Sequence, residues 1–144
     1  MADTKISSKA GRDHGLDVKY KDGTKITSWY IGLINSSGFT AISADDTMAS
    51  HAGWTELNTQ YDEAARVEWA PGAVSNQEVV NATGRVFTFN TSIGVKGYFT
   101  TSDSTKGGSS GTIDDLYEFE STKNFNDDDT LTITHTHKMT NDNS

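Results

Sequence analysis

The chain has 144 residues and a mass of 15.6 kDa, which is the usual size of a single domain. Twenty acidic and twelve basic side chains give a net charge of −8, which repels nucleic-acid phosphates and anionic lipids. We therefore expect neither a nucleic-acid nor a membrane partner. The absence of cysteine excludes disulfides and thiolate chemistry. The N-terminus lacks the apolar stretch of an export signal, so we expect a soluble protein.

The first predicted elements lie near the N-terminus. Residues 1–13 are polar and without periodicity, which predicts a flexible arm. Residues 17–20 and 26–34 read as two strands, and between them Asp22-Gly23 is a dipeptide typical of a tight hairpin. The sequence therefore predicts that a folded domain begins at about residue 14 with a β-hairpin.

The rest of the chain continues the strand pattern. Further segments are rich in β-branched and aromatic residues and are bounded by turn formers: 65–69, 77–80, 85–91, 94–101, 114–121 and 130–138. About eight strands over residues 14–138 predict an all-β fold, an antiparallel β-sandwich of the jelly-roll or immunoglobulin-like type. Residues 45–52 have the pattern of a single helical turn, and residues 139–144 read as a flexible C-terminal tail.

Alternation within these segments predicts which side chains are buried. Val95, Gly97 and Phe99 are expected to share one buried face, and Glu118 and Glu120 are expected to point together toward solvent. The predicted core consists of Trp29, Ile31, Leu33, Trp54, Phe87, Phe89 and Phe99.

The pair Ser50-His51 is the first candidate for catalysis. Adjacent residues diverge on a helix and face opposite sides of a strand, so this histidine is badly placed to activate this serine. The sequence contains no GxSxG nucleophile motif either. We therefore predict no catalytic residues and no enzymatic activity.

Three other stretches are candidates for binding ions. His135 and His137 project from one face of a strand at a spacing that can share a metal, yet two ligands are too few unless three chains meet on an axis. The loop 103–112 has glycines but lacks the Lys-Ser/Thr end of a phosphate-binding loop. Asp127-Asp128-Asp129 lacks the ligand spacing of an EF-hand and reads as a turn. We predict neither a bound metal nor a cofactor.

Three stretches carry a resemblance to a known family: WYIGLI at 29–34, DTMASHAGWTE at 46–56, and GYFTTSDSTKGGSSGT at 97–112. Together with the residues around them, over about 16–138, they resemble a family of small tailed-bacteriophage virion proteins encoded near the major capsid protein. The resemblance implies no catalytic residues. It implies that the motif around Ser50-His51 is a turn that tucks Trp54 into the sandwich, with Gly53 permitting a bend.

The resemblance predicts a decoration, or cement, protein that binds the major capsid protein on the outer surface of the head. Such a protein is synthesised in the host cytoplasm, resides on the virion, and is expected to self-associate as a trimer. Lys5, Lys9 and Arg12 would then form a capsid-docking arm. The alternative is a tail-fibre or receptor-binding module in which exposed rings such as Tyr61, Trp69 or Tyr98 stack on glycans.

Overall fold

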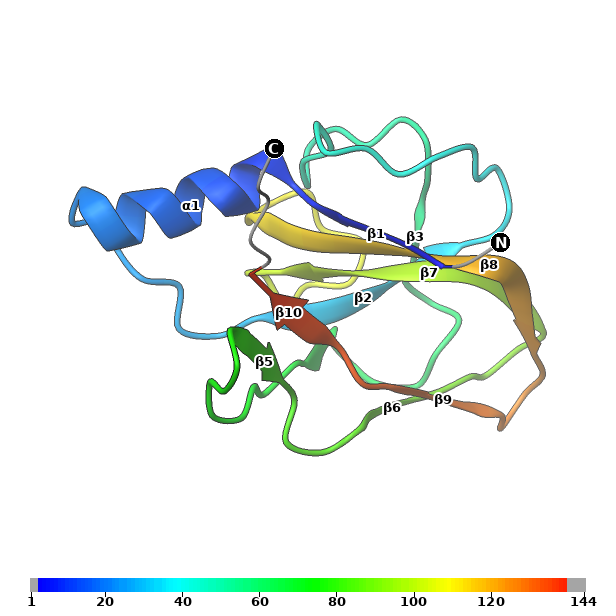
Figure 1. The fold of residues 1–144 in the computed structure, drawn as a ribbon. Helices are drawn as coiled ribbons and strands as arrows, with labels where there is room; N and C mark the ends of the chain where they lie inside the picture. Colours follow the sequence, from blue (N-terminus) through cyan, green and yellow to red (C-terminus); the bar gives the residue numbers. More distant parts are fainter. Residues whose placement is uncertain (1–2, 140–144) are drawn as a thin grey trace.

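The fold is all-β apart from one helix, in a computed structural model that describes residues 3–139 (Figure 1). The elements in chain order are β1 (Thr4–Ser7), α1 (Lys9–Tyr20), β2 (Tyr30–Asn35), β3 (Glu56–Leu57), β4 (Val67–Glu68), β5 (Glu78–Val80), β6 (Arg85–Thr88), β7 (Ile93–Thr101), β8 (Ile113–Phe125), β9 (Thr130–Ile133) and β10 (Thr136–Lys138). Seven of the eight predicted strand segments overlap a strand, and residues 130–138 divide into two.

The strands form one large sheet and two small ones, and all the pairings are antiparallel. The large sheet has the order β1-β8-β7-β2-β3, with β4 also paired to β2, and the small sheets are β5–β10 and β6–β9. Figure 1 shows the small sheets below the large one as a second layer. The predicted antiparallel sandwich is confirmed, and its sheets remain open at their edges.

Both faces of the large sheet are covered, and each carries a separate core. On one face, Ile31 and Leu33 pack with rings from the second layer, including Phe87 and Phe89. On the other face, Ile34 packs with residues that include Trp54 and Phe99. Because β2 is buried on both sides, its sequence is a continuous apolar run instead of an alternating one.

The predicted core is largely confirmed, with one correction to its faces. Six of its seven side chains are buried, and Trp29 is partly buried against the first core. The expectation that Val95 and Phe99 share a face is wrong, because they belong to different cores. The reason is an irregularity in the β7–β8 pairing between Val95 and Gly97, which shifts the alternation. Tyr98 is consequently buried as well.

The N-terminal region differs most from the prediction. Residues 4–7 form an edge strand paired with β8, and residues 9–20 form a helix, so the expected arm, the strand at 17–20 and the hairpin at 22–23 are wrong. Ser8 caps the N-terminus of the helix, and its hydroxyl accepts a hydrogen bond from the Gly11 amide at 2.9 Å. Residues 140–144 of the expected C-terminal tail lie outside the described residues.

The motif at 46–56 forms a turn that buries Trp54, as the resemblance implied. Asp46 accepts hydrogen bonds from the Ser43 amide and from the Trp54 indole, both at 2.9 Å, and no α-helix forms over 45–52. His51 stacks on Trp54 with the ring centres 3.8 Å apart. Gly53 is needed because a Cβ there would lie 2.1 Å from the Ala41 carbonyl oxygen. These contacts make the motif part of the scaffold.

Among residues 3–139 there is no helix of the length and apolar character needed to cross a membrane. The turn predicted at Asp127-Asp128-Asp129 is present between β8 and β9.

Candidate functional site

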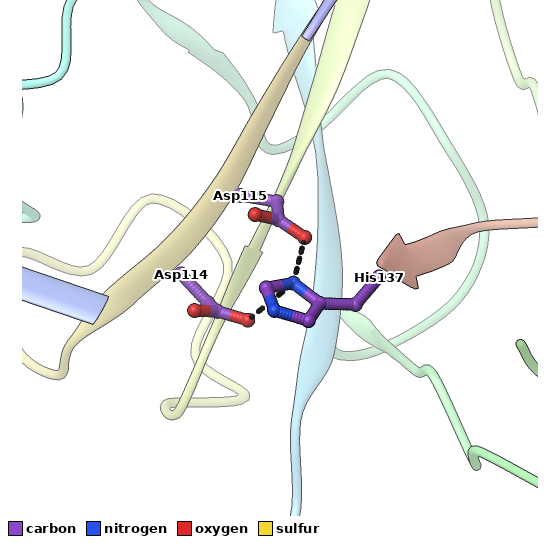
Figure 2. Close-up of side chains that lie close together, drawn as sticks. All are labelled: Asp114, Asp115 and His137. Atoms are coloured by element: carbon purple, nitrogen blue, oxygen red, sulfur yellow. Dashed lines mark hydrogen bonds and ion pairs between the residues drawn. The ribbon is translucent and has the colours of Figure 1, made fainter. Parts of the chain in front are cut away.

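A β-bulge in β8 brings two consecutive aspartates to one place. Between the regular pairs on either side, β7 contributes only Thr100 and β8 contributes both Asp114 and Asp115. Neighbouring side chains in a regular strand face opposite sides, but the extra residue of a bulge re-aims one of them. One oxygen of each carboxylate and one ring nitrogen of His137 therefore lie within 4.8 Å of one another (Figure 2).

Asp115 is fully buried at the centre of this group. Its Oδ2 accepts hydrogen bonds from His135 Nε2 at 2.9 Å and His137 Nδ1 at 2.7 Å, and its Oδ1 accepts one from the Ser7 hydroxyl at 2.8 Å. Lys5 Nζ lies 3.9 Å from Oδ2. Burial favours the neutral acid, but the two imidazole hydrogen bonds outweigh it and hold the pKa of Asp115 well below its ordinary value.

The surroundings of His135 determine its tautomer. An ionised carboxylate can only accept, so Nε2 must carry the proton that it donates to Asp115, and Nδ1 accepts from the Tyr98 hydroxyl at 2.9 Å. Burial lowers the pKa of His135 and raises that of Tyr98, so both groups are held neutral. A directed chain of hydrogen bonds thus runs from Tyr98 through His135 to Asp115.

Asp114 and His137 are the members of the group nearest to solvent, with side chains 20% and 30% exposed. The Asp114 Oδ2 lies 3.6 Å from His137 Nδ1. Burial, followed by the neighbouring charge of Asp115, raises the pKa of Asp114 to about 6. The hydrogen bond to Asp115 raises the pKa of His137 above its ordinary value. The ionised form of Asp114 is therefore disfavoured, because this carboxylate is largely buried and lies beside the charged Asp115.

The start of helix α1 is fastened to this site. The Ser8 hydroxyl donates to the Ile113 carbonyl at 2.6 Å, and the Ser8 amide donates to the Asp114 carbonyl at 2.8 Å. Gly11 allows the helix to approach, since a Cβ there would lie 2.8 Å from the Asp114 Cα. A pocket of about 590 Å³ opens beside the helix, and Asp114 and His137 contribute to its wall. The group is therefore reachable from solvent.

The three residues of the expected docking arm lie on regular elements of the fold, Lys5 on β1 and Lys9 and Arg12 on α1. Lys5 donates to the Thr136 carbonyl. Lys9 pairs with Asp45 at 2.5 Å, and Arg12 Nε donates to the Ser8 carbonyl at 3.3 Å. Because they lie on β1 and α1, a deletion of residues 1–12 would remove an edge strand and the start of the helix.

Two other sequence expectations are corrected by burial. Tyr61, Trp69 and Tyr98 are 1%, 4% and 5% exposed, so these rings are unavailable to stack on a glycan. His135 is 1% exposed, so the arrangement in which both histidines of three chains meet at a common axis cannot form. His135 and His137 do reach one group, as their spacing predicted, and that group is Asp115.

The glycine-rich loop 103–112 is held in place by a buried ion pair. The Arg66 guanidinium makes two hydrogen bonds to Glu56, at 2.6 and 2.8 Å, and donates to the carbonyl oxygens of Asp103 and Gly108. The Gly107 amide donates to Glu56 at 3.0 Å. The Gly107 amide is therefore paired with a carboxylate of the same chain and is not free to bind a phosphate.

Comparisons with known proteins add no relative. Neither a scan against protein-family models nor a search of curated proteins finds a match to this chain.

Sequence reasoning located the two histidines but missed Asp114 and Asp115 as their partners. In a regular strand only one of two neighbouring aspartates could face a given side, and the bulge breaks that rule. The available signal was the pair of consecutive carboxylates between the apolar residues Ile113 and Leu116, a position where charge needs a partner. The group of Asp114, Asp115 and His137 can hold a divalent cation, or it can exchange a proton with a molecule in the adjoining pocket.

Asp114→Asn is expected to stabilise the metal-free protein at pH 7.5. Because the pKa of Asp114 rises from its ordinary 3.8 to about 6 on folding, the folded wild type binds this proton more tightly than the unfolded chain. Wild-type stability therefore gains up to about 3 kcal/mol from this group as the pH falls from 7.5 to 4, at 1.36 kcal/mol per pKa unit. The asparagine does not titrate, so the stability difference between Asp114→Asn and the wild type should shrink in acid. Urea denaturation in EDTA measures the free energy of unfolding of both proteins at both pH values. A difference that does not change with pH would contradict the raised pKa of Asp114.

Proposed function

We propose that the protein is a structural component of a tailed-bacteriophage virion, a decoration protein that binds the major capsid protein on the outer surface of the head. The stretches that carry the family resemblance support a role in binding alone. Residues 29–34 include most of the interior strand β2, residues 46–56 enclose Trp54, and residues 97–112 continue from β7 into the loop held by Arg66. These three stretches therefore contribute to the packing and the loop structure of the fold.

The observation that carries the proposal is the helix α1, which extends beyond the edge of the sheets in Figure 1. Leu16 and Tyr20 lie one turn apart on this helix and are 57% and 66% exposed. Exposed apolar side chains of this size that adjoin a pocket mark an interaction surface. Helix α1 thus takes the docking role that the sequence analysis assigned to an arm.

Charge supports the same surface. Residues 9–25 carry five basic and three acidic side chains, whereas the chain as a whole has a net charge of −8. The helix and the segment after it are therefore cationic on an otherwise anionic protein. A partner surface that combines acidic and apolar groups fits this combination.

The first test is the number of copies on purified virions, by gel densitometry against the major capsid protein. A decoration protein is present in hundreds of copies, and a tail component in a few. A count in the hundreds is expected, and a handful would overturn the assignment to the head.

The second test concerns the docking surface. The double variant Leu16→Glu/Tyr20→Glu should weaken binding to heads that lack the protein by about 30-fold or more, since anchor residues at interfaces each cost about 2 kcal/mol. Val74→Glu makes the same change at a side chain that is 77% exposed and distant in sequence, and it should bind normally. Circular dichroism verifies that both variants fold. Undiminished binding by the double variant would show that another surface docks.

Self-association belongs to this proposal. Stable interfaces bury about 1,200–2,000 Å², which is a large demand on one 15.6 kDa chain, so three copies that share the contact with the shell suit the local symmetry of a capsid. A particle reconstruction is expected to show touching copies, and isolated copies would exclude the trimer.

A further inference from the structure

We propose that Asp114, Asp115 and His137 form a binding site for one divalent cation of the zinc class. The group combines two carboxylate oxygens with an imidazole nitrogen, and it is assembled from two strands that are not neighbours in the sequence. This mixed set of nitrogen and oxygen donors distinguishes it from an acidic surface cluster. Zinc accepts these donors, and many of its sites hold three protein ligands and leave one position open.

The distances fit this assignment. His137 Nδ1 lies 2.7 Å from Asp115 Oδ2 and 3.6 Å from Asp114 Oδ2. Ligand atoms about 2.0–2.1 Å from a tetrahedral zinc ion are separated from one another by roughly 3.3 Å, so small side-chain rotations suffice. The ion would take the place of the proton that His137 now shares with Asp115, and that proton is released to solvent.

The electrostatics of the site favour a cation. Asp115 is fully buried and Asp114 is four-fifths buried, and together they place two carboxylates in one desolvated region. Among residues 3–139, the Asp114 carboxylate has His137 as its ion-pair partner and accepts no hydrogen bond. A bound dication would compensate both carboxylates at once. Calcium and magnesium prefer sites made of oxygen ligands alone, so the imidazole nitrogen of His137 favours zinc, cobalt or nickel.

The surroundings supply the remaining parts of a metal site. The chain from Tyr98 through His135 holds the Asp115 carboxylate in a fixed orientation, as outer hydrogen bonds do around bound metals. The pocket of about 590 Å³ reaches Asp114 and His137 and leaves room for a water molecule in the open position. His14 lines the same pocket.

The test is a calorimetric titration of the untagged, EDTA-treated and desalted full chain with zinc chloride at pH 7.5. We expect one equivalent per chain. His137→Gln and Asp114→Asn should each weaken binding by more than about 100-fold, because the loss of outer-shell partners alone costs 10–100-fold. His51→Gln and Asp127→Asn remove an imidazole and a carboxylate elsewhere, and they should retain wild-type affinity.

Cobalt chloride provides a second readout that reports on coordination directly. The wild type should develop visible absorption bands on titration with cobalt, and His137→Gln should lack them, while circular dichroism shows that the variant is folded. The proposal is overturned if the wild type takes up neither metal, or if both ligand variants bind zinc as tightly as the wild type does. Neither result bears on the capsid-binding proposal.

Discussion

Phe89→Ala is expected to destabilise the protein by about 3–5 kcal/mol, a large part of the 5–15 kcal/mol of a typical domain. Phe89 is fully buried and stacks on Phe125 of β8 with the ring centres 4.4 Å apart. The Phe89 backbone amide donates to the Asp129 carbonyl oxygen, and the Phe89 carbonyl oxygen accepts from the Asp128 backbone amide, both at 2.8 Å. The ring therefore joins the small sheet β6–β9 to the long strand of the large sheet, and its removal leaves a cavity between the layers.

Urea denaturation measures this loss as a lower midpoint. Val86→Ala is the matched control, because Val86 lies on β6, just before Phe89 in the sequence, is 44% exposed and should change the stability by less than about 0.5 kcal/mol. A loss below about 1 kcal/mol for Phe89→Ala would mean that the two layers are not held together by this contact.

Arg66→Met should cost a comparable 3–5 kcal/mol for a different reason. The Arg66 side chain is fully buried and that of Glu56 is 6% exposed, so the substitution leaves a carboxylate desolvated and without its cation. Arg66→Lys should not restore stability, because an ammonium cannot reproduce the two-pronged contact with Glu56 or reach both loop carbonyls.

The double variant Glu56→Met/Arg66→Met distinguishes a lost ion pair from lost packing. It removes both charges, so it should recover part of the stability that Arg66→Met loses, but not all of it, because the Gly107 amide loses its acceptor. Amide hydrogen exchange in residues 103–112 should quicken in Arg66→Met. Unchanged exchange there would show that the ion pair does not hold the loop.

The strands were predictable where the local residue pattern reflects burial, on one face or on both. Period-two alternation located β6 and the rings of Phe87 and Phe89, and the continuous apolar run located β2. The helix α1 was not predictable by the same means, because Gly11 and Gly15 lower its helix propensity and it carries no apolar stripe. Its signal was Ser8 as an N-cap.

The candidate site was predictable only in half. The spacing of His135 and His137 placed them on one face, which the structure confirms. Asp115 faces these histidines together with Asp114 because of a bulge in β8. A bulge depends on how β7 pairs with β8, and the residue types in one strand do not reveal that pairing. The close approach of Gly11 to Asp114 is likewise a long-range contact, and a glycine within a polar stretch gives no sequence signal of it.

The hydrogen bonds around Asp115 also constrain when the protein can finish folding. Ser7 and His137, which both contact Asp115, lie 108 residues before it and 22 after it in the sequence. Contacts of such high separation close late, since the loop entropy must be overcome first. During synthesis, a ribosome that has not yet released residues 135–137 holds a chain whose most buried carboxylate lacks both imidazoles. Among the described residues, β10 therefore supplies a buried contact to Asp115 that the chain can complete only after residues 135–137 have been synthesised.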